Sequence, residues 1–156
     1  MTLTPHGPEF SFLDTLAVVE PGKRARGTKW LDPKSAFFAD HFPGNPLMPG
    51  VLLIECGAQA AGALWMNDRS RDKNVAPTNS AQEAPLTCRS GIPAATVVLA
   101  SVQQFRFLKP VLPAQTVEVE VALEKDFGAL AQFDVILSVD HSTVAQGKLT
   151  MSRGSE

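Results

Sequence analysis

The sequence predicts an α+β domain in which an antiparallel sheet is wrapped around one long central helix. Residues 50–67 are apolar on nearly every face, as in a helix buried at the centre of a domain. The last third of the chain alternates apolar and polar residues in short runs, which is typical of strands with one buried face. The connections between these runs are short, and this favours antiparallel pairing.

The composition is that of one globular domain covering residues 1–156. Hydrophobic residues make up 44% and charged residues 19%, and the net charge of −2 gives no basic excess for nucleic acid. There is no long run of charge that would indicate a membrane surface. The N-terminus has no charged and apolar stretch typical of a secretory signal, so we expect a cytoplasmic protein.

Short elements are expected before the helix. They are a strand within residues 10–20, a turn at Pro21 and Gly22, an edge strand over 23–31, and a helical turn at 33–38 capped by Asp32 or Ser35. Three prolines follow at positions 43, 46 and 49, and they prevent helix formation until the last is passed. The long helix is therefore expected to begin near Gly50 and to end near Asn67. Its glycines and alanines would let the sheet approach closely.

Residues 68–95 are polar and aperiodic, and we expect a mobile surface loop there. Strands are expected after the loop, at 96–108, 116–124, 129–140 and 143–152, with a tight turn around His141 and Ser142 between the last two. Of the two cysteines, Cys56 is expected to be a buried inert thiol and Cys88 a surface thiol. No Cys/His cluster has the spacing of metal ligands.

Two lone titratable residues are the first candidates for chemistry. His41 lies in the turn rich in proline and glycine, and an imidazole suits proton transfer at neutral pH. Taken alone, a histidine there more often only satisfies a backbone carbonyl. Glu55 interrupts the apolar run, where a charged carboxylate is costly to bury, so it is paired, protonated or used in catalysis. A glutamate that reaches solvent near the helix start is an equally open interpretation.

Two further features lie on the same helix. Gln59 is four residues after Glu55, on the same face, and can orient the carboxylate by a hydrogen bond. Gly50 and Val51 begin the helix, where unpaired backbone N–H groups can bind a carbonyl oxygen that gains negative charge. A plain helix start after Pro49 and a satisfied polar glutamine are the alternatives.

Together these residues supply a base, an acid and an oxyanion site, with no nucleophilic serine or cysteine. Such a set suits proton abstraction next to a carbonyl with loss or gain of water, and it needs neither metal nor cofactor. Chain spacing alone cannot bring His41 to Glu55, so a tertiary or quaternary contact has to do so.

The stretch FFADHFPGNPLMPGVLLIECGAQAAG at 37–62 closely resembles the signature of the 3-hydroxyacyl-(acyl carrier protein) dehydratases of type II fatty acid synthesis. It is most similar to the broad-specificity branch, which has glutamate in the helix. The segments EPGKRARGTKWL and QFRFLKPVLPAQTVEVEVAL also resemble strands of that family. The resemblance covers most of the chain outside residues 1–10 and 68–95.

The resemblance implies a hot-dog fold, and a homodimer that is often a trimer of dimers, with His and Glu of each site from different subunits. It implies that His41 takes the C2 proton of a (3R)-3-hydroxyacyl thioester, and that Glu55 protonates the departing hydroxyl. The N–H groups of Gly50 and Val51 would bind the thioester oxygen, and an apolar tunnel would hold the acyl chain. Arg106 and Lys109 correspond to the basic cluster that meets the acyl carrier protein.

The sequence departs from the family pattern in three places. Asp40 stands where a glycine usually precedes the histidine, and it either acts on His41 or points away. Leu108 replaces one positive charge of the basic cluster, which leaves weaker carrier docking or a different carrier open. The segment PHGPEFSFLD is only loosely similar to the family's opening, and we expect His6 to be a solvated terminal residue.

Other functions remain open from the sequence. One is an acyl thioester hydratase or thioesterase of the same fold. Another is a non-catalytic or companion-dependent subunit in a specialised fatty acid, polyketide or polyene pathway.

Overall fold

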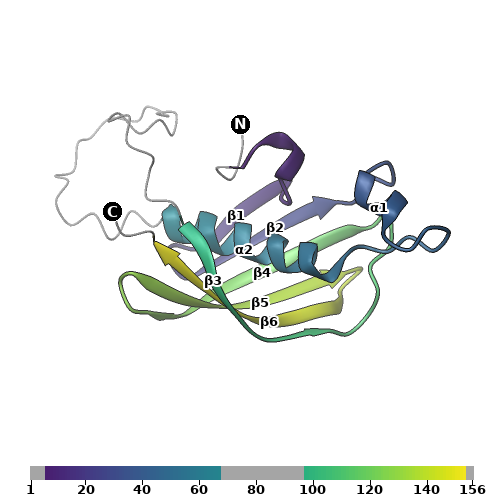
Figure 1. Cartoon of the computed structure of the whole chain (residues 1–156). Coiled ribbons are helices and arrows are strands. Elements are labelled where there is room, and N and C mark those ends of the chain that lie inside the picture. Colours follow the sequence, from purple (N-terminus) through teal and green to yellow (C-terminus); the bar gives the residue numbers. More distant parts are fainter. Residues whose placement is uncertain (1–5, 68–96, 154–156) are drawn as a thin grey trace.

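The structure is a computed structural model and describes residues 6–67 and 97–153. A six-stranded antiparallel sheet curves around the long helix α2, with strand order β1-β2-β4-β5-β6-β3 (Figure 1). The elements are η1 (Pro8–Phe10), β1 (Thr15–Glu20), β2 (Arg24–Trp30), α1 (Ala36–Asp40), α2 (Gly50–Met66), β3 (Val97–Phe107), β4 (Thr116–Asp126), β5 (Leu130–Val139) and β6 (Ser142–Arg153). The predicted α+β architecture, with one central helix, is confirmed.

Helix α2 is the centre of the core. From Cys56 to Trp65 every residue is buried. The small residues of this stretch let the sheet lie close to the helix. A Cβ added at Gly57 would lie 2.7 Å from Cγ1 of Val135 on β5, which is closer than non-bonded atoms approach. The loss of helix propensity at Gly57 is therefore offset by close packing of the helix against the sheet.

The strands follow the expected alternation. On β4, Val117, Val119 and Val121 face the core while Glu118 and Glu120 lie on the outer face. On β5 the buried positions are again every second residue. Strands β5 and β6 are joined through Asp140 and His141, both at positive φ, which matches the tight turn predicted there.

Several expected bounds were wrong. Residues 23–31 were expected to form an edge strand, but β2 pairs with β1 on one side and β4 on the other. The edges are β1 and β3. The first strand begins only at Thr15, after η1, and the helical turn expected at 33–38 lies at 36–40, where Ser35 is its N-cap without a side-chain hydrogen bond. The predicted loop at 68–95 and Cys88 lie outside the described residues.

Strand β3 is an edge with apolar side chains on it. It pairs with β6 alone in the described part of the chain, and Val98, Leu99 and Val102 are exposed by 48%, 38% and 43%. A long, exposed apolar edge strand is a surface that proteins normally cover. Among the described helices, none combines the length and apolar character that crossing a membrane requires.

Candidate active site

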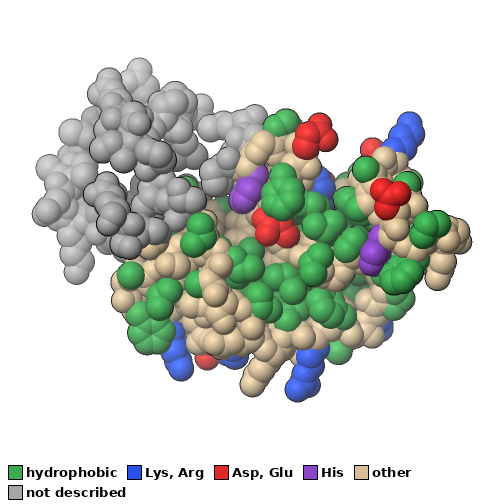
Figure 2. Space-filling view, viewed as in Figure 1, with side chains coloured by type: hydrophobic (Ala, Val, Ile, Leu, Met, Phe, Trp, Pro, Cys, Tyr) green, Lys and Arg blue, Asp and Glu red, His purple; other side chains and the backbone are tan. Residues whose placement is uncertain are grey.

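Glu55 lies at a cavity between α2 and the free edge of the sheet. The cavity has a volume of about 290 Å³, and most of its lining is apolar. The helix contributes one face of small and apolar residues, and β3 and β6 contribute the other side. The lining residues include Glu55, Ala58, Gly62, Met66, Val98 and Met151. Figure 2 shows apolar side chains gathered on this face of the molecule, with few charges among them.

Gln59 holds the Glu55 carboxylate, as the i, i+4 spacing indicated. Its Nε2 donates to Glu55 Oε1 at 2.9 Å and also to the carbonyl oxygen of Phe10 at 2.9 Å. Its Oε1 accepts the backbone N–H of Phe12 at 2.9 Å. Gln59 is only 3% exposed, so a buried carboxamide with all its partners fixes Glu55 and the N-terminal segment together. The link to the N-terminal segment was not foreseen from the sequence.

His6 also contacts Glu55, and the expectation that it is a solvated terminal residue was wrong. Its Nε2 lies 3.7 Å from Glu55 Oε1, and its side chain is 36% exposed, against 22% for Glu55. His6 lines the same cavity and its ring lies against Phe10, with ring centroids 5.7 Å apart. The only sequence signal was the loose similarity of PHGPEFSFLD to the opening of the family.

His41 is the C-cap of α1, where the chain turns toward α2. Its Nδ1 lies 2.9 Å from the carbonyl oxygen of Leu47, and its ring lies tilted by 55° against the Phe42 ring, with the centroids 4.4 Å apart. In the neutral ring, an Nδ1–H that donates to this carbonyl leaves Nε2 as the acceptor nitrogen, as a general base requires. Asp40 is exposed and forms no ion pair with His41 in the part of the chain that the structure describes.

One chain does not join the expected base to the expected acid. Within residues 6–67 and 97–153, no hydrogen bond or ion pair connects His41 and Glu55, and His41 does not line the Glu55 cavity. The two side chains are thus held in orientation by separate local contacts. The expectation that chain spacing alone cannot bring them together agrees with this arrangement.

The start of α2 carries the predicted oxyanion position. Pro49 is the N-cap and supplies no side-chain hydrogen bond, and in the described part of the chain the N–H groups of Gly50 and Val51 have no acceptor. Such N–H groups point outward with the positive end of the helix dipole. The glycine also has a packing role, because a Cβ at position 50 would lie 2.9 Å from the Phe107 ring of β3.

Arg106 and Lys109 lie exposed at the end of β3 that reaches Gly50 through Phe107. The Lys109 Nζ donates to Ser142 Oγ at 2.8 Å. Within the described residues, neither cation has a carboxylate at ion-pair distance. Both charges therefore remain available to an acidic partner.

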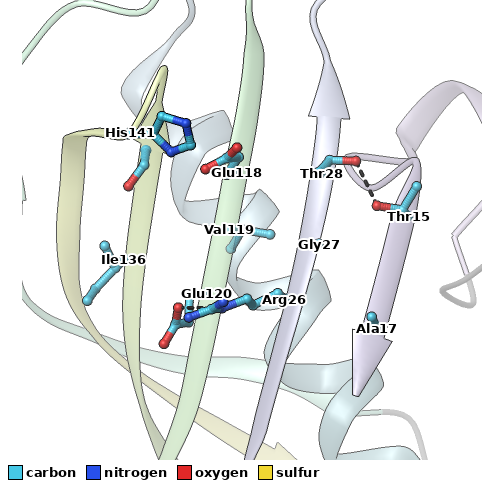
Figure 3. A pocket seen from close by; sticks show the side chains of 11 residues that line it. Thr15, Ala17, Arg26, Gly27, Thr28, Glu118, Val119, Glu120, Ile136 and His141 are labelled. Carbon is cyan, nitrogen blue, oxygen red and sulfur yellow. Dashed lines mark hydrogen bonds and ion pairs between the residues drawn. The ribbon is translucent and has the colours of Figure 1, made fainter. Parts of the chain in front are cut away.

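A second and larger groove lies on the outer face of the sheet, opposite α2. Its volume is about 630 Å³, and the labelled side chains come from β1, β2, β4 and β5, with His141 at one end (Figure 3). Arg26 Nε donates to Glu120 Oε2 at 2.7 Å, and Thr15 and Thr28 hydrogen-bond to each other. These polar groups satisfy one another, and the groove contains neither Glu55 nor His41.

The cavity at Glu55 therefore offers proton-transfer chemistry beside an apolar channel. Its lining contains the Glu55 carboxyl group and the His6 imidazole, whereas the N–H groups of Gly50 and Val51 lie at the start of the same helix, outside this lining. No group of three His, Cys, Asp or Glu side chains that could hold a metal ion occurs among the described residues.

Comparison with known proteins gives the family. Residues 4–96 match the FabA-like domain. The chain belongs to the FabA-like family. Family members named 3-hydroxyacyl-[acyl-carrier-protein] dehydratase FabZ include that of Herpetosiphon aurantiacus, 30% identical over 149 residues, which cover 96% of this chain and 91% of that protein. Another, from Anaeromyxobacter sp., is 33% identical over 144 residues, covering 92% and 80%. The predicted family, and its broad-specificity branch, are thus confirmed.

The fold is shared with solved structures of low sequence identity. The dehydratase heterocomplex ApeI:P from Xenorhabdus doucetiae contains a chain that superposes with a TM-score of 0.71 at 14% identity, covering 99% of this chain and 90% of that one. The hot-dog fold that the resemblance implied is therefore confirmed for this member of the FabA-like family.

Proposed function

We propose that this chain dehydrates (3R)-3-hydroxyacyl carrier-protein thioesters to trans-2-enoyl thioesters. The observation that carries the proposal is Glu55, a half-buried carboxyl group held by Gln59 at the mouth of an apolar cavity, in a chain of this family. The relatives that match over nearly the whole chain are dehydratases of such thioesters by name. The proposed reaction uses only proton transfers, so it needs neither metal nor cofactor.

In the proposed reaction, His41 Nε2 takes the proton from C2 of the thioester. The C2–H electron pair forms the new double bond with C3, and negative charge develops on the thioester oxygen. The N–H groups of Gly50 and Val51 stabilise that charge. Glu55 gives its proton to the C3 hydroxyl, the C3–O bond breaks, and water leaves. His41 ends protonated and Glu55 ionised, so one proton has to return from His41 to Glu55 through solvent before the next turnover.

We propose that a second copy of the chain completes the site. His41 and Glu55 are not in contact within one chain, and the Glu55 cavity is lined by edge strand β3, which pairs with β6 alone among the described residues. A copy paired along β3 would cover the exposed side chains of Val98, Leu99 and Val102 and close the cavity. Each site would then use Glu55 of one chain and His41 of the other. Three such dimers can assemble further into a hexamer.

The direct test is a dehydration assay with carrier-linked 3-hydroxyacyl substrates, in which enoyl formation is followed by absorbance. We expect the wild-type chain to be active. His41→Ala and Glu55→Gln should each lower kcat at least about a hundredfold. The exposed His141, on the outer face, gives a matched control in His141→Asn. Folded variants of His41 and Glu55 that keep the wild-type rate would contradict the assigned roles. Release of free thiol without enoyl product would indicate a thioesterase.

Mixing the two inactive variants tests the shared site. If each site takes one residue from each chain, half of the randomly formed dimers are mixed, and half of their sites are intact. Co-refolded His41→Ala and Glu55→Gln chains should therefore regain about a quarter of the wild-type activity. No recovery, with dimers present by light scattering, would mean that both residues act within one chain.

The proposed carrier site is Arg106 with Lys109, two exposed cations at the β3 end beside Gly50. Charge reversal to glutamate at both positions should raise KM for a carrier-linked substrate about tenfold. The rise in KM should be larger at low salt, where charges are screened less. The KM for the same acyl group on a small thiol should stay within about twofold, since it lacks the acidic carrier. Equal effects on both substrates would rule out a carrier-specific role.

One alternative is favoured by a specific observation. One chain does not complete the site, and this leaves open a companion chain in place of a second copy. The solved structure ApeI:P, which shares the fold, is itself a dehydratase heterocomplex. Purified chain that is inactive alone and gains activity when a second hot-dog protein is added would support this alternative.

A further inference from the structure

The inference concerns the two oxygens of the Glu55 carboxyl group. Oε1 accepts a hydrogen bond from Gln59 Nε2 at 2.9 Å and lies 3.7 Å from His6 Nε2. No hydrogen bond or ion pair reaches Oε2 from the part of the chain that the structure describes. Both neighbouring nitrogens therefore face the same oxygen, and Oε2 has no partner among the described residues.

His6 is held in place by its ring and not by other polar contacts. The ring packs against Phe10, whose carbonyl oxygen accepts from Gln59, so the whole segment is tied to α2 next to Glu55. His6 Nδ1 is buried and has no hydrogen-bond partner. Nδ1 has no acceptor for a hydrogen, whereas Nε2 faces a carboxyl oxygen that can accept one, and this favours the neutral ring with its hydrogen on Nε2, facing Glu55.

The cavity itself isolates this pair. Among the described residues that line it, His6 and Glu55 are the two titratable ones, and the neighbours from β3 and β6 are apolar. Lys29, on β2, is paired with Asp14 at 2.9 Å and does not line the cavity. No other charged side chain of the lining competes with His6 for the carboxyl group.

We propose that His6 is a positioning residue for Glu55 and determines which carboxyl oxygen carries the proton. With Oε1 occupied as an acceptor by Gln59 and His6, the acid proton resides on Oε2, which remains free to face the C3 hydroxyl of the substrate. His6 neither gains nor loses a proton in this role. The role rests on the proposed dehydratase function, in which Glu55 is the acid.

The distance of 3.7 Å is longer than a hydrogen bond, so the contact has to shorten by less than 1 Å when substrate fills the cavity. Acid–base contacts of unliganded enzymes commonly tighten in this way when substrate binds.

Two substitutions separate a hydrogen-bond role from a packing role. His6→Phe keeps an aromatic ring against Phe10 but removes the N–H donor. His6→Gln keeps an N–H donor but removes the ring. We expect His6→Phe to lower kcat about tenfold, as for loss of one hydrogen bond to a carboxyl group, with KM within about twofold. His6→Gln should stay within about threefold of wild type. The opposite order, or wild-type kcat in His6→Phe, would overturn the proposal.

A spectroscopic measurement tests the contact without the reaction. In ¹H–¹⁵N spectra of the full chain at a pH where the ring is neutral, His6 should be an Nε2–H tautomer. In Glu55→Ala that preference should weaken, while His141, on the other face of the sheet, should not change. An Nδ1–H tautomer, or no response to Glu55→Ala, would overturn the proposal.

The two proposals fail in different ways. A wild-type chain without dehydratase activity would contradict the proposed function, and the tautomer experiment would still decide whether His6 is bound to Glu55. If the wild type is active and His6→Gln loses more kcat than His6→Phe, the dehydratase function is retained and the positioning role of His6 is contradicted.

Discussion

The carboxamide of Gln59 joins Glu55 to the N-terminal segment of the same chain. Its Nε2 donates to both the Glu55 carboxyl group and the Phe10 carbonyl, and its Oε1 accepts from the Phe12 N–H. One buried side chain thus couples the proposed acid to the folding of residues 10–12.

Replacing Gln59 should therefore affect stability and activity together. In Gln59→Leu the Phe10 carbonyl and the Phe12 N–H lose their partners, and we expect the free energy of unfolding to fall by about 2–4 kcal/mol. Because Glu55 also loses its orientation, kcat should fall about tenfold or more. Urea unfolding and the dehydration assay measure the two effects.

The control for this substitution is Gln103→Leu. The Gln103 carboxamide also forms a side-chain hydrogen bond, because its Oε1 accepts from Gln132 Nε2, but this bond is exposed. Its replacement should change the free energy of unfolding by less than about 0.5 kcal/mol and leave kcat unchanged. If both variants lose a similar amount of free energy of unfolding, the buried hydrogen bonds of Gln59 contribute no more to stability than the exposed one of Gln103.

Two glycines of α2 should respond in opposite ways to alanine. In Gly57→Ala the new methyl group would meet Val135 at 2.7 Å, so we expect destabilisation by about 1–3 kcal/mol. In Gly62→Ala the neighbours, Val97 and Met151, are at 3.7 and 3.8 Å, which is ordinary contact, and the higher helix propensity of alanine should stabilise by up to about 1 kcal/mol. Thermal unfolding compares them, and equal destabilisation of both would contradict this packing.

A larger side chain at Gly62 should shorten the accepted acyl chain. Gly62 lines the cavity two turns beyond Glu55, a distance of about 10 Å along the helix. We expect Gly62→Leu to lower kcat/KM at least tenfold for long acyl substrates and less than threefold for a four-carbon one. An equal loss for all lengths would mean that the cavity does not hold the chain.

Cys56 should resist thiol reagents at any pH at which the protein is folded. Burial raises the pKa of its thiol from 9.0 to about 12. The thiolate is the reactive form, so less than about one molecule in a thousand is reactive at pH 8 even before access is considered. In a Cys88→Ser variant, which retains one thiol, labelling should follow unfolding in urea.

The raised pKa also links Cys56 to stability. The folded state holds the thiol proton of Cys56 more tightly than the unfolded state does. The contribution of this thiol to the free energy of unfolding is therefore fully present below the unfolded-state pKa and is lost as the pH rises toward 12. Cys56→Ala should reduce the loss of stability between pH 8 and pH 10. Rapid labelling of native Cys56 at pH 8 would contradict its burial.

The fold could be predicted because local patterns agree with the tertiary structure. Three prolines followed by an apolar run placed the start of α2 at Gly50, and strict alternation placed β4. The position of β2 inside the sheet could not be predicted from such a local pattern. The polar alternation of residues 23–31 indicated one solvated face, and it gave no information on whether both edges of β2 were paired.

The site was predictable only where its contacts are local. The bond from Gln59 to Glu55 follows from helical spacing, and the turn at His41 is set by neighbouring residues. The contacts of Glu55 with His6 and of Gln59 with Phe10 and Phe12 join residues about 50 positions apart. No periodicity in the sequence reports such contacts, which is why His6 was expected to be in solvent.

Helix α2, which carries Glu55, lies in the core and packs against several strands of the sheet. Its backbone amides beyond Glu55 should exchange with deuterium only when the entire domain opens, since no smaller opening exposes them. Heat inactivation of the enzyme and loss of its tertiary structure should then be one and the same event.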